Sequence, residues 1–448
     1  MRETERFIKA ISEVVWGAPM LILVVGCGVY LTFRLGFFQI TQLRFWTRET
    51  FGALFRREER KKGGITPCQA VSSALASSIG TGNIVGVATA IASGGAGAVF
   101  WMWISAFFGM AVKYAEIFLA VKFRDESGGK YRGGPMVYIE KGMGKGYKWL
   151  GILFSVSGAV ACLGMGAMSQ SNSIAEVAKL GAGVPGWMCG SVLAVIAAFA
   201  VCGGITRVTK ITQVLVPFMA MMYILGGLAV AVIAPASAAS AVRQIFSSAL
   251  APKAVYGSLA GEAVRRAVRV GVSRGVFSNE AGLGSAPIVH AAAETKSPVY
   301  QGLWGVFEVF VDTVIVCSIT AIVILSAGCP KKGVTGAELV AVSFSKFFGA
   351  FGGVFVGVAT VLFALSTILG WSYYGERCVA YLTNENALAC RAYKILFVLA
   401  VMLGALICVE SVWALADLFN GVMMVPNLIA VISLSGIVIR ETKKCFRL

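Results

Sequence analysis

Long apolar stretches, separated by short polar connections, recur from one end of the chain to the other. A helix needs about 20 mainly apolar residues to cross the hydrocarbon core of a bilayer, and windows of that length predict about eleven membrane-spanning helices. Their expected ranges are 14–33, 66–92, 96–121, 150–178, 187–205, 213–234, 258–292, 299–327, 350–374, 393–408 and 411–438. The connections are too short to form a core of their own. The pattern predicts an all-α integral membrane protein with one transmembrane domain over residues 1–448.

The composition and the charge pattern add an orientation. Of the 448 residues, 57% are hydrophobic and only 14% are charged, whereas soluble domains carry about a quarter charged residues. The net charge of +17 comes from Lys and Arg in alternate connections, which indicates positive-inside topology and no nucleic-acid partner. We expect a multi-pass protein of a prokaryotic plasma (inner) membrane, with the N-terminus outside and the C-terminus cytoplasmic. The aromatic and basic segment from Phe37 to Phe55 predicts an interfacial helix.

Two expected spans contain residues that interrupt a helix. The second span has Gly80, Thr81, Gly82 and Asn83 near its middle, and each glycine weakens a helix by about 1 kcal/mol. The seventh span has a denser cluster, made of Ser278, Asn279, Glu280, Gly282, Gly284, Ser285 and Pro287. Backbone N–H and C=O groups that lose their helical partners within the hydrocarbon must line a cavity or bind a ligand or ion. The alternative for the seventh span is an ordinary loop between two shorter segments. Such a loop would add one membrane crossing, and Lys and Arg of all later connections would then fall on the opposite side of the membrane.

Broken helices at matching places in two halves are typical of transporters built from inverted repeats. We therefore expect a first repeat at 66–240 and a second at 258–438, a 5+5 arrangement. Residues 1–65 would form an extra N-terminal helix with the interfacial segment, and 439–448 a cytoplasmic tail. The free N–H groups at one half-helix end suit a carboxylate, and the free carbonyls at the other suit an ammonium or a sodium ion.

Six segments then carry a family resemblance. They are GTGNIVGVATAI (80–91), FWMWISAFFGMAVKYAE (100–116), GGPMVYIEKGMG (133–144), SRGVFSNEAGLGSAP (273–287), LWGVFEVFVDT (303–313) and STILGWSYYGE (366–376). At these segments the chain resembles the alanine or glycine:cation symporter family, which are sodium-coupled amino-acid transporters of the leucine-transporter (APC) fold. The resemblance implies import of alanine or glycine with Na⁺ as the co-transported ion, without an organic cofactor, by a monomer in contact with membrane lipid.

The resemblance also implies the site residues. The substrate would be bound by Thr81, Gly82, Asn83, Gln170, Phe277, Asn279, Gly282, Thr367 and Trp371. Sodium would be bound by Ala76, Ile79, Ser366 and Thr367, and Gly80, Ser278, Glu280 and Gly284 would shape the breaks or couple them. A bulky Phe277 and Trp371 would restrict the pocket to small side chains. Before Gln170 the chain has Gly166, Ala167 and Met168 where the family pattern has Gly-Asn-Met, so the missing amide leaves the substrate open.

A transporter of the same fold for glutamine or serine, or one coupled to protons, is the nearest alternative. A channel would need a filter or charged rings, and an enzyme would need a nucleophile with a base or a metal cluster, which one histidine and no CxxC spacing do not supply. We therefore expect a carrier and not an enzyme.

Charged residues inside apolar spans are functional candidates by default. Glu280 is expected to accept N–H bonds in its break or to contribute to cation coupling. Lys113 and Glu116 are three residues apart and are expected to pair with each other. Glu308 and Asp312 are expected to support a neighbouring polar break, with a proton or cation path as the alternative. His290 is expected to be structural, with a proton relay as the alternative, and Arg265, Arg266, Arg269 and Arg274 have no assigned role.

Overall fold

The computed structural model describes residues 17–446, apart from gaps at 56–63, 128–129, 250–257, 329–333, 335 and 407–409. The first residues of the expected 14–33 span, the basic connection at 56–63 and the last two residues of the expected 439–448 tail lie outside the described residues. The regular elements of the described part are helices and one antiparallel hairpin, in which β1 (Asp125–Ser127) pairs with β2 (Lys130–Arg132); Ile65 and Ala293 also form an isolated parallel bridge. The prediction of an all-α architecture is confirmed to that extent.

The helices follow the expected ranges closely. In the first half they are α2 (Ala18–Arg34), α3 (Phe38–Thr41), α4 (Leu43–Thr50), η1 (Ala53–Phe55), α5 (Pro67–Ser78), η2 (Thr81–Asn83), α6 (Val85–Gly94), α7 (Gly97–Lys122), α8 (Pro135–Tyr138), η3 (Ile139–Met143), η4 (Lys145–Tyr147), α9 (Lys148–Ala161), η5 (Cys162–Met168), α10 (Ser169–Ala182), α11 (Gly186–Cys202), α12 (Gly204–Ile233) and α13 (Pro235–Ala249). In the second half they are α15 (Ser258–Asn279), α16 (Ala286–His290), α17 (Pro298–Val309), η6 (Phe310–Cys317), α18 (Ser318–Ser326), α19 (Gly336–Phe348), α20 (Ala350–Leu382), α21 (Ala387–Gly404), α22 (Glu410–Ser433) and α23 (Ser435–Phe446).

By length and composition, fewer of the described helices qualify as membrane spans than the eleven that the sequence predicts. Seven described helices are long and apolar enough to cross a membrane, and the bent pair α5–α6 can be an eighth. Helices α2 and α11 have 17 residues each, which is short of the roughly 20 that a span needs. Helix α15 is long enough, but Arg265, Arg266 and Arg269 make its first half polar. A multi-pass membrane protein is therefore confirmed, whereas eleven spans are not.

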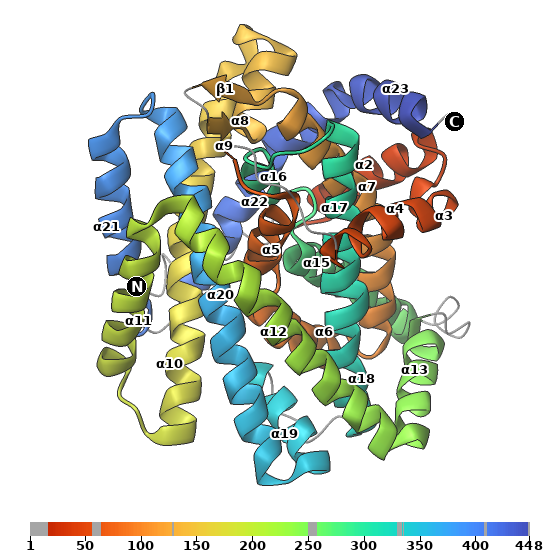
Figure 1. Cartoon of the computed structure of the whole chain (residues 1–448). Helices are drawn as coiled ribbons and strands as arrows, with labels where there is room; N and C mark the ends of the chain where they lie inside the picture. Colours follow the sequence, from red (N-terminus) through yellow and green to blue (C-terminus); the bar gives the residue numbers. More distant parts are fainter. Residues whose placement is uncertain are drawn as a thin grey trace.

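The two broken pairs lie in the middle of the helix bundle (Figure 1). Helices α13 and α19 lie at one end of the bundle, and the hairpin and α23 lie at the other. Glycines let α15 approach α7 closely, since a Cβ at Gly271 would collide with the backbone oxygen of Ala98, and one at Gly275 with Ser105. Such small-residue contacts are what hold helices together where lipid removes the hydrophobic drive.

The first break follows directly from the sequence. Helix α5 begins at a capping box, in which Thr66 and Gln69 bond each other's backbone N–H groups, with Pro67 at the first position, a typical helix start. It ends before Gly80, and the chain resumes as α6 after a bend of 58°. The predicted interruption of the second span is confirmed.

The second break is a turn with three residues in the left-handed region. Glu280 has φ 57°, Gly282 has φ 93° and Gly284 has φ 77°, a conformation that glycine adopts without strain and other residues rarely adopt. Helix α16 then runs for only five residues. Helix α16 is therefore too short to span a membrane by itself, and a single broken span over α15 and α16 stays a prediction.

The segment from Phe37 to Phe55 forms short helices instead of one. Phe37 is left-handed (φ 53°) at the start of α3, and α4 follows after Gln42. Trp46 is buried and its indole N–H donates to the carbonyl oxygen of Gln39 at 3.0 Å. The predicted helical character is confirmed, and one face of the segment is packed onto the bundle.

Candidate functional site

The end of α5 places carbonyl groups inside the protein. The N–H of Gly80 donates to Asn83 Oδ1 at 3.0 Å, so it does not close the last helical turn onto Ala76. The last four carbonyls of a helix have no partner in their own helix. Here the carbonyl of Ile79 instead accepts from the Ser366 hydroxyl at 3.4 Å, and both residues are buried.

Helix α20 brings two hydroxyl groups to this helix end. Ser366 and Thr367 also donate to the carbonyl of Phe363, at 2.8 and 3.0 Å. The Thr367 hydroxyl lies against Gly80, where a Cβ would collide with it. Carbonyl and hydroxyl oxygens are the ligands of hard cations such as sodium. The structure brings Ile79, Ser366 and Thr367 together, and Ala76 is buried in the last turn of α5.

The first break is also joined to the π-helix η5 and to the second break. Thr81 donates from its hydroxyl to Gln170 Oε1 at 3.1 Å, and Gln170 Nε2 donates to the carbonyl of Met165 at 3.2 Å. A Cβ at Gly82 would lie 3.7 Å from the ring of Phe277 and from the Cα of Ser278. The two broken helices therefore meet at Gly82.

The side chain of Asn279 shapes the second break. Its Oδ1 accepts the N–H of Ala281 at 3.0 Å and its Nδ2 donates to the Thr313 hydroxyl at 3.1 Å. Gly282 faces the other way, since a Cβ there would meet Met424 of α22 at 3.2 Å. The structure thus brings Asn279 to the site but turns Gly282 away from it. Gly284 likewise packs against other elements, at Pro135, Asn427 and Phe154.

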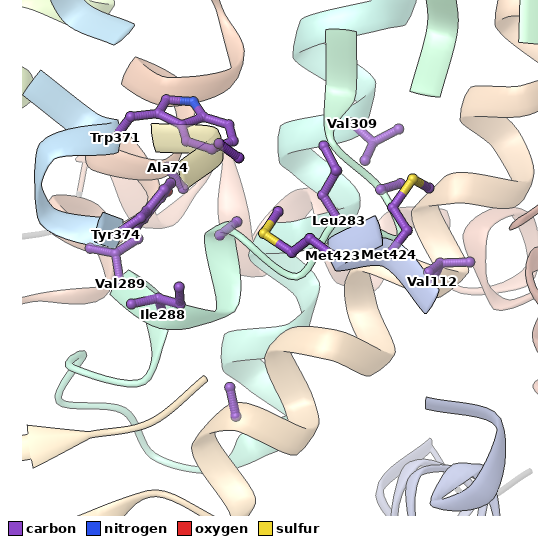
Figure 2. Close-up of a cluster of buried hydrophobic side chains, with 14 of the residues drawn as sticks. Ala74, Val112, Leu283, Ile288, Val289, Val309, Trp371, Tyr374, Met423 and Met424 are labelled. Atoms are coloured by element: carbon purple, nitrogen blue, oxygen red, sulfur yellow. The ribbon is translucent and has the colours of Figure 1, made fainter. Parts of the chain in front are cut away.

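Glu280 joins the second break to α20. Its Oε1 accepts the indole N–H of Trp371 at 3.1 Å, and its Oε2 accepts from the Ser285 hydroxyl. It is therefore held by side chains and not by the backbone N–H groups that we expected. The Trp371 ring lies 5.9 Å from that of Tyr374, and Figure 2 shows both beside Ala74 of α5, with Leu283 of the break packed near Met423 and Met424.

Asp312 is a connection that the sequence did not reveal. Its Oδ1 accepts from Asn83 Nδ2 at 2.7 Å, and its Oδ2 accepts from the hydroxyls of Ser278 at 2.9 Å and Thr313 at 2.8 Å. One carboxylate thus bonds both breaks. Asp312 was noticed as a charge in a span, but the spacing within its own helix says nothing about partners on other helices.

Lys113 and Glu116 do not pair with each other, contrary to expectation. Lys113 Nζ donates to the carbonyl of Asn279 at 3.0 Å and lies 3.9 Å from Glu308 Oε2. Glu116 instead accepts from the amide of Asn427 in α22. Neighbours three apart on a helix can meet, but in this core other helices offer better partners to each charge. Asn427 also donates to the carbonyl of Gly282 at 2.8 Å, and it was missed altogether.

The arginines of α15 separate into two kinds. Arg265 is exposed and lies 3.7 Å from Glu262 on the same helix, and Arg266 and Arg269 are also exposed. Arg274 is half-buried, with its guanidinium 5.7 Å from the centre of the Phe277 ring. Only Arg274 therefore touches the candidate site.

Taken together, the site offers carbonyls and hydroxyls for a small cation and, beside them, amide, hydroxyl and aromatic groups for a small polar molecule. Among the described residues, no group of three or more His, Cys, Asp or Glu side chains could hold a metal ion.

The comparisons with known proteins point to one family. The sodium:alanine symporter family matches residues 1–447. The sodium/alanine symporter AgcS of Methanococcus maripaludis is 46% identical over 444 residues, which cover 97% of this chain and 96% of that protein. The probable sodium/glutamine symporter GlnT of Bacillus subtilis is 35% identical over 450 residues, covering 98% and 90%.

Among solved structures, a manganese transporter of Eremococcus coleocola has a similar fold. The TM-score is 0.50 and the sequence identity is 11%, over 79% of this chain and 75% of that one. At this identity the likeness concerns the arrangement of helices alone.

Proposed function

Because the chain belongs to the sodium:alanine symporter family, we propose that it imports a small neutral amino acid, alanine or glycine, together with sodium. The observation that carries this proposal is the meeting of the two broken helices beside α20. Ile79, whose carbonyl accepts from the Ser366 hydroxyl, is three residues from Gly82, where the breaks touch, and the Thr367 hydroxyl lies against Gly80 between them. A cation and an amino acid bound there would share the same short stretch of backbone.

The roles of the site residues follow from their chemistry. Sodium would be held by oxygens of Ala76, Ile79, Ser366 and Thr367. The amino acid would bind at the adjoining first break, with Gln170 and Asn279 as amide partners. Phe277 and Trp371 would limit the size of its side chain, since both rings are buried against the breaks.

The finer architecture is part of the proposal. Helices α2 and α11 and the α15–α16 pair, counted with the seven apolar helices and the bent pair, supply eleven segments at the expected ranges. We infer a 5+5 inverted repeat of the leucine-transporter type. The hairpin end of the bundle would face the cytoplasm of a prokaryote, because Lys and Arg collect at that end. The N-terminus would then lie outside.

Alanine is favoured over glutamine by the relative at 46% identity, which is named for alanine, while a relative at 35% is named for glutamine. The test is uptake of labelled alanine into proteoliposomes with and without a sodium gradient, with glycine, serine and glutamine as competitors. We expect sodium to accelerate uptake and glycine to compete best. Uptake that ignores sodium, or stronger competition by glutamine than by glycine, would contradict the proposal.

A counterflow measurement separates a carrier from a channel. Unlabelled alanine inside the proteoliposomes should accelerate the entry of labelled alanine, because a carrier returns faster when loaded. The absence of acceleration would favour a channel.

A further inference from the structure

Helix α23 packs beside the short helices α3 and α4, at the same end of the bundle as the hairpin (Figure 1). The rings of Phe446 and Phe45 meet edge to face with their centres 5.3 Å apart, and the ring of Phe446 is stacked 6.5 Å from that of Phe38. The three helices therefore form one surface element, although they come from opposite ends of the chain.

Helices α4 and α23 each turn a basic face outward. The buried residues of α23 are three or four positions apart and face the bundle, as in an amphipathic helix; they are Ser435, Val438, Ile439 and Thr442. The exposed Lys and Arg side chains of the two helices are Arg44, Arg48, Arg440, Lys443 and Lys444. Arg44 and Arg48 are four residues apart and share a helix face, and so do Arg440 and Lys444.

Few carboxylates offset these cations. Helices α4 and α23 contain one acidic residue each, and both are paired. The carboxylate of Glu49 lies 3.1 Å from Arg48, and that of Glu441 lies 2.7 Å from Lys122 at the end of α7. The two helices thus carry five exposed cations against two carboxylates, and one of these carboxylates is already bound by a cation of another helix.

Exposed apolar side chains lie next to this basic face. Ile40 of α3 and Leu43 of α4 have exposed fractions of 62% and 51%, and Leu43 directly precedes Arg44. A soluble anion such as inorganic phosphate would bind the cations but would leave these apolar side chains in water. A phospholipid with an anionic headgroup satisfies both, and four to eight Lys and Arg beside an amphipathic helix are typical of such binding.

Helix α23 is also joined to the helix that holds the second break. The hydroxyls of Thr442 and Tyr114 are hydrogen-bonded at 2.7 Å, and the ion pair with Lys122 gives a second contact to α7. Tyr114 directly follows Lys113, whose ammonium donates to the carbonyl of Asn279 at 3.0 Å. A ligand that orders α23 therefore acts on α7 next to the side chain that positions the second break.

We propose that α4 and α23 form a binding surface for the headgroup of an anionic phospholipid, and that a lipid bound there raises the rate of transport through α7. The five cations contact the headgroup phosphate, and Ile40 and Leu43 contact the acyl chains. The bound lipid holds α23 in place and so steadies the contact of Lys113 with Asn279. The effect on transport rests on the proposed function, whereas the binding of lipid does not.

Binding is measured by native mass spectrometry of the purified full-length protein, titrated with phosphatidylglycerol or with zwitterionic phosphatidylcholine. We expect the native protein to bind phosphatidylglycerol more tightly, and excess inorganic phosphate should not displace it. The double substitution Lys443→Gln with Lys444→Gln should weaken this binding. Each cation near a membrane surface contributes about fivefold to the affinity, so the loss should be roughly 25-fold.

The matched control is Arg266→Gln with Arg269→Gln, which removes the same charge from exposed positions of α15. This part of α15 lies beside the start of α7, since Gly271 packs against Ala98, whereas α23 lies at the other end of α7. We expect the control to bind phosphatidylglycerol as the native protein does. The proposal is overturned if phosphatidylglycerol binds no more tightly than phosphatidylcholine, if phosphate displaces it, or if both double variants lose the same affinity.

Transport is measured as the initial rate of sodium-driven alanine uptake into phosphatidylethanolamine vesicles with an increasing share of phosphatidylglycerol. The rate should rise with phosphatidylglycerol in the native protein and in the α15 control, and much less in the Lys443 and Lys444 variant. A rate that ignores phosphatidylglycerol in the native protein, or a full response in that variant, overturns the proposal. Absence of sodium-driven uptake at every lipid composition would contradict the proposed function instead, and the mass-spectrometric titration would still decide whether the lipid binds.

Thr442→Val tests the route through α7, because it removes the hydrogen bond to Tyr114 but none of the cations. We expect phosphatidylglycerol to bind this variant with native affinity, while the response of the uptake rate to the lipid is lost. A full response of Thr442→Val would show that the lipid does not act through this contact, and the proposed route would be wrong.

Discussion

Gly80→Ala tests the proposed sodium site with the smallest possible change. A Cβ at Gly80 would collide with the Thr367 hydroxyl, and the backbone there is extended (φ −135°, ψ −157°), which any residue adopts. The effect must therefore come from the collision. Overpacking of this kind costs about 1–3 kcal/mol, which corresponds to a roughly 5- to 150-fold rise in the sodium concentration for half-maximal uptake if the hydroxyl leaves the ion.

Gly86→Ala is the matched control. Gly86 lies in the same span, within α6, and is also buried, but a Cβ there would meet no atom within 4 Å. Alanine is favoured over glycine in a helix by up to about 1 kcal/mol. We expect Gly86→Ala to leave the sodium requirement unchanged and the melting temperature equal or higher. A raised sodium requirement in Gly86→Ala would show that the span tolerates no substitution, whatever its position.

A double-mutant cycle with Thr367→Ala then isolates the mechanism. Once the hydroxyl is removed, the β carbon of residue 367 would lie 3.5 Å from the new Cβ, an ordinary contact. Gly80→Ala should therefore add nothing beyond about 0.5 kcal/mol on that background. The assay is the initial rate of alanine uptake over a range of sodium concentrations at saturating alanine. The reasoning is refuted if Gly80→Ala leaves the sodium requirement unchanged, or raises it equally on both backgrounds.

Three further substitutions probe the amino-acid side of the site. Trp371→Phe keeps an aromatic side chain, although a smaller one, and removes the N–H donated to Glu280; a hydrogen bond to a charged group is worth about 1.5–3 kcal/mol, so kcat/KM for alanine should fall roughly 10- to 150-fold. Phe277→Ala should enlarge the pocket, and serine and glutamine should become better competitors of alanine uptake; an unchanged order of competitors would remove Phe277 from the pocket. Asp312→Asn should weaken the bonds to both breaks, reducing sodium-driven uptake at least about tenfold in a protein that still migrates as one species on gel filtration.

The sequence predicts the helix breaks well because their causes are local. Gly80 and Gly82 interrupt the second span, and the glycines after Glu280 take up left-handed conformations that other residues avoid. Both features depend on a few adjacent residues and on the length of the apolar run. The same local reasoning predicts most helix ranges to within a few residues.

Contacts between spans could not be predicted in this way. Lys113 was assigned to Glu116 on its own helix, yet it reaches the carbonyl of Asn279 and the carboxyl of Glu308. Asn427, an amide within the apolar run of α22, was overlooked although its polarity at that depth is a signal that could have been used. Helical spacing shows which residues share a face, but it does not show which face of which helix lies opposite.

The short distance between the two halves of the site explains how one bound species could favour the other. Ile79, whose carbonyl belongs to the proposed sodium site, is three residues from Gly82, where the breaks touch. Gly80 lies between them, and its N–H donates to the side chain of Asn83. Asp312 extends that tie to Ser278 of the other broken helix. An ion that orders this backbone lowers the entropy that the amino acid must lose on binding, and the amino acid does the same for the ion. Because such a coupling is reciprocal, alanine must raise the affinity for sodium by the same factor by which sodium raises the affinity for alanine.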